Sequence, residues 1–190
     1  MAINLKKGQR VSLDKGMKLA LVGLGWDVNM FDTGGSFDLD ASAFLLGKND
    51  KLIDEKDFVF YNNLSDRSGA VVHKGDNRSG AGEGDDEVII IDFTKIPDEI
   101  QKIAICVTIY DESNRLTFGQ VSNAFVRVAK LANEFDSAGE DQIRFDLGEE
   151  FSIETALLVC EIYRYNGEWK FNAVGAGYAG GLQALVDKYN

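Results

Sequence analysis

The chain is short of the residues from which many active sites and covalent scaffolds are built. Its 190 residues include one histidine, two cysteines and one proline. A Ser-His-Asp or Cys-His triad would have to use His73, which lies just before Gly75 and has no serine or cysteine in a recognised nucleophile setting. We therefore predict that His73 is a surface residue or one that supports a neighbouring site.

The two cysteines, Cys106 and Cys160, do not form a CxxC motif, which argues against zinc binding and dithiol redox chemistry. Each lies inside an apolar, strand-like run. They could pair if the fold made them adjacent, but their surroundings favour buried free thiols in a reducing compartment.

Long apolar runs and an excess of positive charge are also missing. No segment approaches the roughly 20 apolar residues of a membrane span, and the N-terminal residues lack the apolar core of a signal peptide. We therefore expect a cytoplasmic protein. With 20 basic and 31 acidic residues, the net charge of −11 argues against direct nucleic-acid binding, because phosphate contacts need clustered Lys and Arg. It also disfavours an anionic membrane surface unless Ca²⁺ bridges the two.

What the sequence has instead is a series of short segments rich in β-branched and aromatic residues, separated by Gly, Asn and Asp. We predict strands at Val11–Leu13, Lys18–Trp26, Phe37–Leu46, Asp57–Tyr61, Glu87–Asp92, Lys102–Tyr110, Gln142–Leu147, Thr155–Tyr165 and Glu168–Ala176. Asn166-Gly167 predicts a two-residue type I′ hairpin.

Two segments break this strand pattern. Residues 119–135 place Val121, Phe125, Val128, Ala132 and Phe135 at helical spacing, which predicts an amphipathic helix packed on a sheet. A shorter helix is expected at about 181–188. Together these elements predict a mainly β protein, a two-sheet sandwich with one amphipathic helix and a short C-terminal helix, in a single domain over residues 1–190.

The most distinctive segment is GDNRSGAGEGDDE, at residues 75–87. Its carboxylates repel one another at this spacing, and only Arg78 offsets their charge. Ca²⁺ would resolve that conflict, because it takes six to eight oxygen ligands and glycines let the backbone turn its carbonyls inward. The alternative is a flexible acidic loop. We predict side-chain ligands at Asp76, Asn77, Asp85, Asp86 and Glu87, and main-chain carbonyls at Arg78 and Gly84.

A second acidic segment supports the metal interpretation. Asp38 and Asp40 alternate with Leu39 along a predicted strand, so the two carboxylates point to the same face, about 7 Å apart. Asp27 is close enough in sequence to join them. The alternative is a polar strand face at a sheet edge. Taken together, the two segments predict Ca²⁺ binding, with more than one ion.

Two enzymatic interpretations compete with this one. Mg²⁺ at the same carboxylates could support phosphate-ester hydrolysis, but such sites usually carry Lys or Arg groups that clamp phosphate, and only Lys74 and Arg78 lie near the cluster. A Mg²⁺-dependent phosphoesterase stays the alternative to a non-enzymatic protein. Residues 175–180 fit GxGxxG but lack the βαβ context of a dinucleotide site, so we expect a tight turn that closes the sandwich.

Six blocks occur in order over nearly the whole chain: VGLGWD (22–27), FDLDASAFLL (37–46), DFVFYNN (57–63), GDNRSGAGEGDDE (75–87), FGQVSNAF (118–125) and GEWKFNAVGAGYAGGL (167–182). Together they resemble the tellurium-resistance TerD family. Ala81 departs from the pattern, since family members often carry an acidic residue there.

The resemblance implies a bacterial Ca²⁺-binding β-sandwich, linked to tellurite resistance and general stress response, with no established catalytic activity. The acidic residues of the second and fourth blocks, and Asp27 of the first, would be the family-like ligands. We therefore predict a stress protein that acts through Ca²⁺-dependent contacts with other stress-response proteins, membrane-associated complexes among them.

Overall fold

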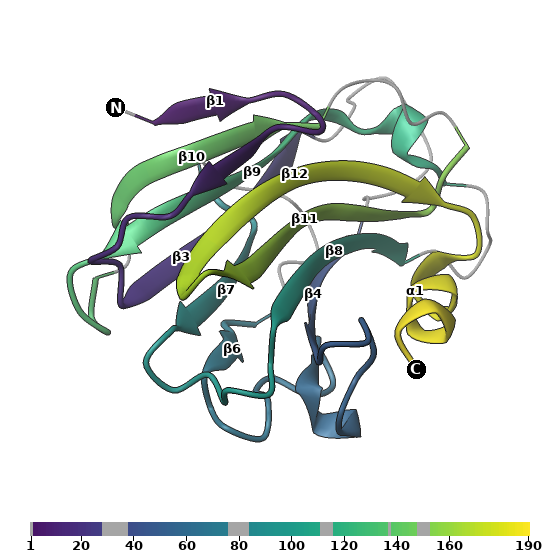
Figure 1. Ribbon diagram of the computed structural model, residues 1–190. Helices are drawn as coiled ribbons and strands as arrows, with labels where there is room; N and C mark the ends of the chain where they lie inside the picture. The colour runs from purple at the N-terminus through teal and green to yellow at the C-terminus, as the bar shows by residue number, and fades with distance from the viewer. Residues whose placement is uncertain (1, 28–37, 76–83, 111–115, 137, 148–152) are drawn as a thin grey trace.

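The computed structural model describes residues 2–27, 38–75, 84–110, 116–136, 138–147 and 153–190. Two sheets of six strands each pack face to face (Figure 1). The order in sheet A is β1 (Ile3–Leu5), β10 (Glu140–Asp146), β9 (Ser122–Leu131), β3 (Leu19–Asp27), β7 (Glu87–Asp92) and β6 (Val71–His73). The order in sheet B is β2 (Arg10–Ser12), β12 (Glu168–Tyr178), β11 (Ala156–Tyr165), β8 (Lys102–Tyr110), β4 (Asp38–Leu46) and β5 (Phe58–Val59). The predicted two-sheet sandwich is confirmed.

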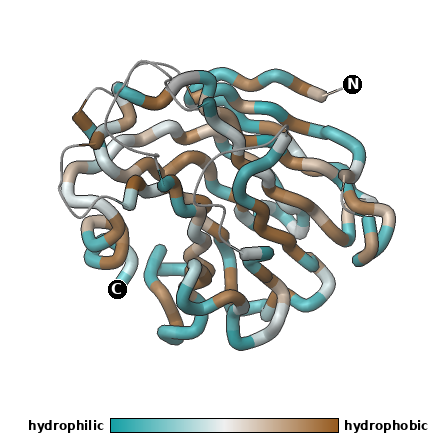
Figure 2. The backbone as a smooth tube through the Cα atoms, turned by 180° about the vertical axis from the view of Figure 1, so that it is seen from behind, coloured by the Kyte–Doolittle hydropathy of each residue, from teal (hydrophilic) through white to brown (hydrophobic). Residues whose placement is uncertain are grey.

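Antiparallel pairing dominates both sheets, and among the strand pairs of the described residues only β1–β10 is parallel. Hydrophobic stretches run along the strands, and hydrophilic residues gather in several of the turns (Figure 2). At the hairpin between β11 and β12, Asn166 and Gly167 have φ values of 51° and 77°. A type I′ turn requires positive φ at both central positions, so the predicted hairpin is confirmed.

The core lies between the two sheets. Alternate residues of each strand point into it, as Leu39 and Ala41 of β4 do against Ile89 and Ile91 of β7. A second cluster fills the outer face of sheet B, where Leu185 and other residues of helix α1 (Gly181–Tyr189) pack against β8, β11 and β12. The predicted C-terminal helix is therefore present, and it covers one end of sheet B (Figure 1).

The predicted helix at 119–135 is wrong. A 3₁₀ turn at Phe118–Gln120 leads into strand β9, which pairs with β3 on one side and β10 on the other. The segment has apolar residues at so many positions that its pattern fits both the helical and the strand period. Pairing with β3 favours the strand. Phe135, which the helix would have buried, is 87% exposed in the turn after β9.

The remaining sequence expectations concern thiols, the glycine motif and membrane spans. Cys106 and Cys160 are free and buried, and they lie in clusters on opposite faces of sheet B. The GxGxxG segment forms the end of β12 and the turn into α1, whose N-cap is Gly180 at φ 104°. No helix in the described ranges is long and apolar enough to cross a membrane.

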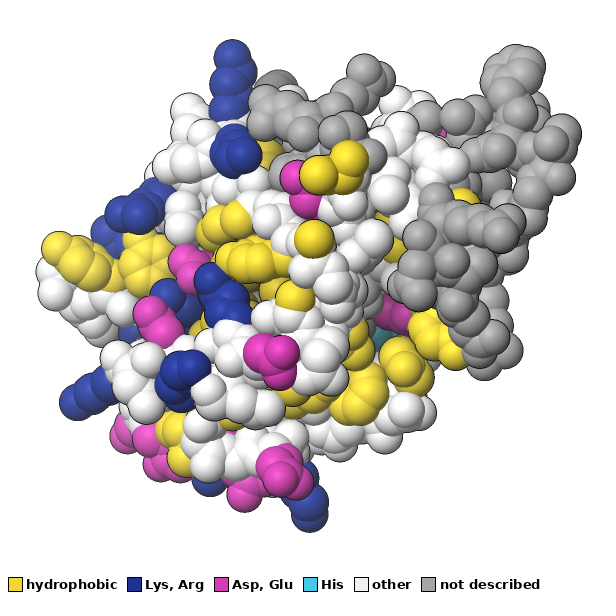
Figure 3. Space-filling model, turned by 90° about the vertical axis from the view of Figure 1, so that its right-hand side faces the viewer, with side chains coloured by type: hydrophobic (Ala, Val, Ile, Leu, Met, Phe, Trp, Pro, Cys, Tyr) yellow, Lys and Arg dark blue, Asp and Glu magenta, His cyan; other side chains and the backbone are white. Residues whose placement is uncertain are grey.

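Lys and Arg side chains are scattered among acidic ones on the face shown in Figure 3.

Candidate metal centre

Two glycines of β3 make room for the end of the acidic segment. Gly84 and Asp85 lie across the outer face of the strand, on the side away from sheet B. A Cβ atom at Gly23 would lie 2.2 Å from Cγ of Asp85, and one at Gly25 would lie 2.8 Å from the carbonyl oxygen of Gly84. Side chains at these two positions would therefore displace the segment. The absence of a side chain at Gly23 and Gly25 is therefore what lets the acidic segment pack against β3.

Asp85 is held by an arginine that the sequence analysis did not connect with the site. Nε of Arg127 donates to both carboxylate oxygens of Asp85, at 2.8 and 2.9 Å, and Nη2 donates to Oδ2 at 2.6 Å. Nη1 donates to the carbonyl of Ala138 at 3.2 Å and also pairs with Asp141. The hydrogen bonds that Arg127 donates to Asp85, and secondarily the one that it donates to Asp141, raise the pKa of Arg127, which stays charged. In this arrangement Asp85 fixes the acidic segment to sheet A.

Asp86 is hydrogen-bonded to the backbone of β3 through both its own backbone and its side chain. Its backbone N–H donates to the carbonyl of Leu24 at 2.6 Å, and its Oδ2 accepts from the backbone N–H of Trp26 at 3.0 Å. Burial raises the pKa of Asp86, and the negative charges of Asp85, Asp27 and Glu87 raise it further, against the opposing effect of the Trp26 N–H. Asp86 is thus the centre of a group of mutually repelling carboxylates.

Glu87 points into the core between the sheets, where it meets His73. The Glu87 side chain is fully buried, and its Oε2 lies 2.9 Å from Nε2 of His73. Nδ1 of the histidine accepts a hydrogen bond from the N–H of Gly75 at 3.1 Å. His73 is buried, which excludes the surface alternative and makes it the support of a predicted ligand.

The other predicted ligands lie in three places. Asp27 ends β3 on the exposed outer face of sheet A, and its Oδ2 accepts from Nδ2 of Asn123 at 2.6 Å. Asp38 and Asp40 begin β4 on the outer face of sheet B, because the residues between them point into the core. Asp40 is buried, as is Oδ1 of Asp38. Asp76, Asn77 and Arg78 lie outside the described residues.

The structure therefore brings Asp27, Asp85, Asp86 and Glu87 to one end of β3 and β7. It places Asp38 and Asp40 at the same end of the sandwich but on the other sheet; we call this end the acidic end. Among the residues that the structure describes, no three or more His, Cys, Asp or Glu side chains are grouped closely enough to hold a metal by themselves. A cation at Asp86 would need ligands from outside the described residues, and residues 76–78 precede this group in the chain.

Arg127 and Asn123 were missed because their segment was predicted as a helix. The signal was present, since Phe125-Val126-Arg127-Val128 alternates between the two faces of a strand. Val126 and Val128 enter the core, whereas Arg127 stays on the outer face beside Gly23, its partner in β3. Had the segment been predicted as a strand, Arg127 would have been placed on its polar face. It would then have been a candidate ion-pair partner for one of the acidic side chains.

Comparison with known proteins identifies the family. The model of the TerD domain matches residues 1–189. The chain belongs to the TerD family. It is 51% identical to the tellurium resistance protein TerD of Serratia marcescens, over 100% of this chain and 97% of that protein. It is 50% identical to general stress protein 16U of Bacillus subtilis, again over 100% of this chain and 97% of that protein.

The fold of this TerD-family chain also matches a solved structure, that of a homologue of the telluride resistance protein from Streptomyces coelicolor. The TM-score is 0.71 at 22% identity, over 90% of this chain and 96% of the other. Two of the blocks that carry the family resemblance meet in space. VGLGWD supplies the two bare glycine positions of β3, and the end of the acidic block, Gly84–Asp86, lies over them. The two blocks, far apart in the sequence, therefore pack against each other in the fold.

Proposed function

We propose that this TerD-family protein binds Ca²⁺ at its acidic end and acts in the stress response through Ca²⁺-dependent contacts with partner proteins, without catalysis. The observation that carries the proposal is the environment of Asp86. Burial and three neighbouring carboxylates disfavour its charge, and a divalent cation would offset both effects at once. Asp27, Asp86 and Glu87 are the proposed ligands from the described part of the site, and Asp76, Asn77 and Arg78 the proposed ligands from the adjoining loop.

Asp38 and Asp40 support a second ion on sheet B. Their carboxylates share the outer face of β4, and Asp40 is buried there, where ligation of a cation would favour its charged form. Because these carboxylates belong to sheet B and the Asp86 group adjoins β3 and β7 of sheet A, we propose a separate ion for each set of ligands. Two independent binding events are therefore expected in a calcium titration.

Ca²⁺ suits the Asp86 group better than Mg²⁺. The available ligands are carboxylates from different segments and main-chain carbonyls, of which Gly84 provides one over Gly25. Ca²⁺ accepts such irregular sets of oxygens, whereas Mg²⁺ demands nearly octahedral geometry. Asp85 is already bonded to Arg127. Its proposed role is to hold the loop in place, and direct ligation through Asp85 requires that this pair open.

Non-enzymatic action is supported by the state of the reactive side chains. The single histidine is buried between the N–H of Gly75 and the side chain of Glu87, and burial raises the pKa of both thiols. Neither group is placed to act as a nucleophile or as a general base on a bound substrate. Tellurite is an anion, and a chain with a net charge of −11 is poorly suited to capture it directly. Resistance is therefore proposed to be indirect, through partners.

Calorimetric titration after chelator treatment tests the metal. We expect heat on addition of Ca²⁺, a weaker response to Mg²⁺, and loss of one binding event in Asp86→Asn. Asp98→Asn is the matched control, because it removes the same charge from a fully exposed side chain outside the acidic end. No heat and no change in melting temperature at millimolar Ca²⁺ would refute calcium binding.

A pull-down from stressed cells, with Ca²⁺ or with chelator, tests the mode of action. Partners retained only with Ca²⁺, and lost with Asp86→Asn, are the expected result. A parallel screen for phosphatase and nuclease activity covers the enzymatic alternative. Mg²⁺-dependent hydrolysis that disappears in Asp86→Asn and persists in Asp98→Asn would overturn the non-enzymatic proposal.

A further inference from the structure

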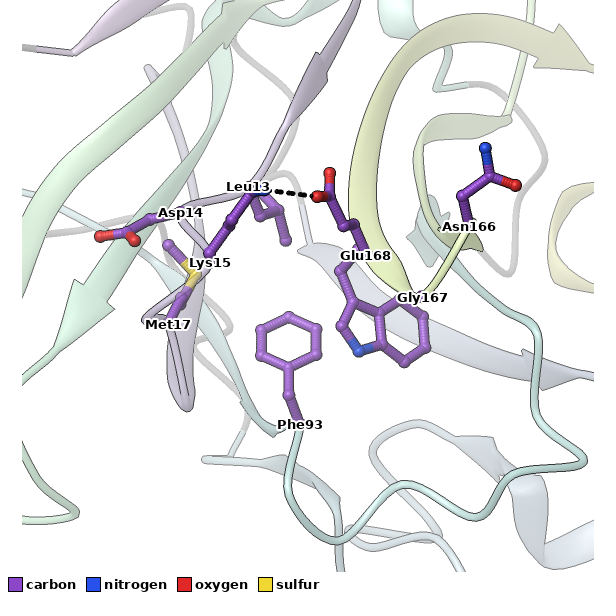
Figure 4. A pocket seen from close by; sticks show the side chains of 9 residues that line it. Leu13, Asp14, Lys15, Met17, Phe93, Asn166, Gly167 and Glu168 are labelled. Atoms are coloured by element: carbon purple, nitrogen blue, oxygen red, sulfur yellow. Dashed lines mark ion pairs between the residues drawn. The ribbon is translucent and has the colours of Figure 1, made fainter.

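The end of the sandwich opposite to the acidic end contains a cavity of about 390 Å³ (Figure 4). It opens between the turn that leads into β3, the residue after β7 and the β11–β12 hairpin. Phe93 follows the end of β7, and its N–H donates to the carbonyl of Lys18, just before β3. The proposed ligands Asp27 of β3 and Glu87 of β7 lie at the other ends of these strands. The cavity is therefore separate from the proposed metal site.

Aromatic and apolar side chains form the inner wall of the cavity. The rings of Phe93 and Trp169 are 5.3 Å apart between centroids and inclined by 44°. Leu13 and Met17, both buried, lie beside them. Arg164 does not line the cavity but places its guanidinium 4.7 Å from the Trp169 ring, which holds the indole in position. Two rings and a thioether make a surface on which a flat ring can stack.

Charged groups stand at the mouth. Nζ of Lys15 lies 2.8 Å from Oε1 of Glu168, and the dashed line in Figure 4 marks this pair above the two rings. The Lys15 side chain is 81% exposed, whereas that of Glu168 is 37% exposed and belongs to strand β12. The hydrogen bond from Lys15 lowers the pKa of Glu168, which remains a carboxylate at neutral pH. Asp14 adds a second carboxylate, paired with Lys130 at 2.7 Å.

We propose that this cavity is a binding site for a small aromatic ammonium compound. The aromatic ring stacks against Phe93 and Trp169, and the ammonium group takes the place of Lys15 at Glu168. The exchange costs little, because an exposed ion pair contributes only about 0–1 kcal/mol. The volume lies at the lower end of the range for ligand pockets, about 300–1,000 Å³. The lining is mixed, with Leu13, Met17, Phe93 and Trp169 on the apolar side and charged and amide groups on the other.

The charges favour a cationic ligand over an anionic one. An anion would have to bind Lys15, an exposed side chain, and would approach two carboxylates. A cation binds Glu168, which the strand fixes beside the Trp169 ring, and the net charge of −11 attracts it to the protein.

Three isosteric probes test the proposal: phenethylammonium, the neutral 2-phenylethanol and the anionic 3-phenylpropionate. The readout is the pair of indole N–H signals in a ¹H–¹⁵N spectrum of the wild-type protein. Trp169 lines the cavity, whereas Trp26 is buried in the core and serves as the internal control. We expect phenethylammonium to shift the Trp169 signal alone, with half-saturation at about 1 mM, the alcohol to bind more weakly and the acid most weakly.

Two charge variants separate the roles of the mouth residues. Glu168→Gln should weaken phenethylammonium binding about three- to fivefold and leave 2-phenylethanol unchanged, because it removes only the exposed charge-assisted contact. Lys15→Gln, which removes the competing cation, should tighten phenethylammonium binding about two- to threefold. Melting curves establish that each variant is folded.

Three results would overturn the proposal: no shift of Trp169 with any probe, tightest binding by 3-phenylpropionate, or unchanged phenethylammonium binding in Glu168→Gln. Because the metal ligands lie at the other end of both sheets, none of these results bears on calcium binding. The titrations can be run with and without Ca²⁺ to confirm that independence.

Discussion

Gly23→Ala is expected to destabilise the protein by displacing a carboxylate on the neighbouring segment. The new Cβ would lie 2.2 Å from Cγ of Asp85 and 2.3 and 2.4 Å from its oxygens. No rotation of a methyl group relieves contacts that short, so the Asp85 carboxylate must leave Arg127. The strand itself does not resist the change, since alanine is otherwise favoured over glycine in a strand by about 0.5–1 kcal/mol.

The magnitude follows from what Arg127 loses. Hydrogen bonds to charged groups contribute about 1.5–3 kcal/mol, and breaking a buried ion pair costs about 3–5 kcal/mol. The side chains of Arg127 and Asp85 are 18% and 7% exposed, and the arginine keeps Asp141 and a main-chain carbonyl. The loss is therefore expected near the lower end, and the alanine preference offsets part of it. We expect a net cost of about 2 kcal/mol, which lowers the melting temperature by about 4–8 °C.

Urea and thermal unfolding in the presence of chelator measure this cost without a contribution from bound metal. Gly16→Ala is the control: its Cβ would make only ordinary contacts, the nearest at 3.4 Å, and it should change stability by less than about 0.5 kcal/mol. In an Asp85→Ala background the obstacle is gone, so Gly23→Ala should cost almost nothing. Equal destabilisation by Gly23→Ala in both backgrounds would show that the carboxylate is not the cause.

Three further outcomes follow from the same structure. Calcium at a hundredfold excess over Kd should stabilise the wild type by about 2.7 kcal/mol per site. Asp86→Asn should lose the calcium-dependent stabilisation from one site, whereas Asp98→Asn should retain it. An equal loss in both variants would exclude Asp86 as a ligand. Cys106 and Cys160, whose pKa burial raises, should react with a thiol reagent only in the unfolded protein, and rapid modification of the native chain would contradict their burial. Hydrogen bonds from backbone N–H groups of its own turn, that of Ala132 first, lower the pKa of Asp136. The stabilisation by Asp136 is therefore complete above the unfolded pKa of about 3.9 and is lost as pH falls through the folded pKa. Asp136→Asn should reduce the loss of folding stability in this acidic range, and an unchanged curve of stability against pH would exclude the effect.

Local features of the sequence predicted most of the fold. The strand segments, the C-terminal helix and the Asn166-Gly167 hairpin were found because alternation, helix spacing and turn chemistry are properties of neighbouring residues. The prediction of a helix at 119–135 was wrong because the structure of that segment depends on residues far away in the sequence. Its apolar residues suit either period, and the choice depends on β3 and β10, which are distant in sequence.

The candidate site divides in the same way. The sequence determined which residue types are available, since an acidic, glycine-rich segment and paired aspartates indicate a cation from composition and spacing alone. Only the tertiary structure decided their neighbours. Asp85 pairs with Arg127, Glu87 with His73, and Asp40 lies on the opposite sheet. Register between strands far apart in the chain sets those contacts, and one residue of shift would turn every side chain of a strand to the other face.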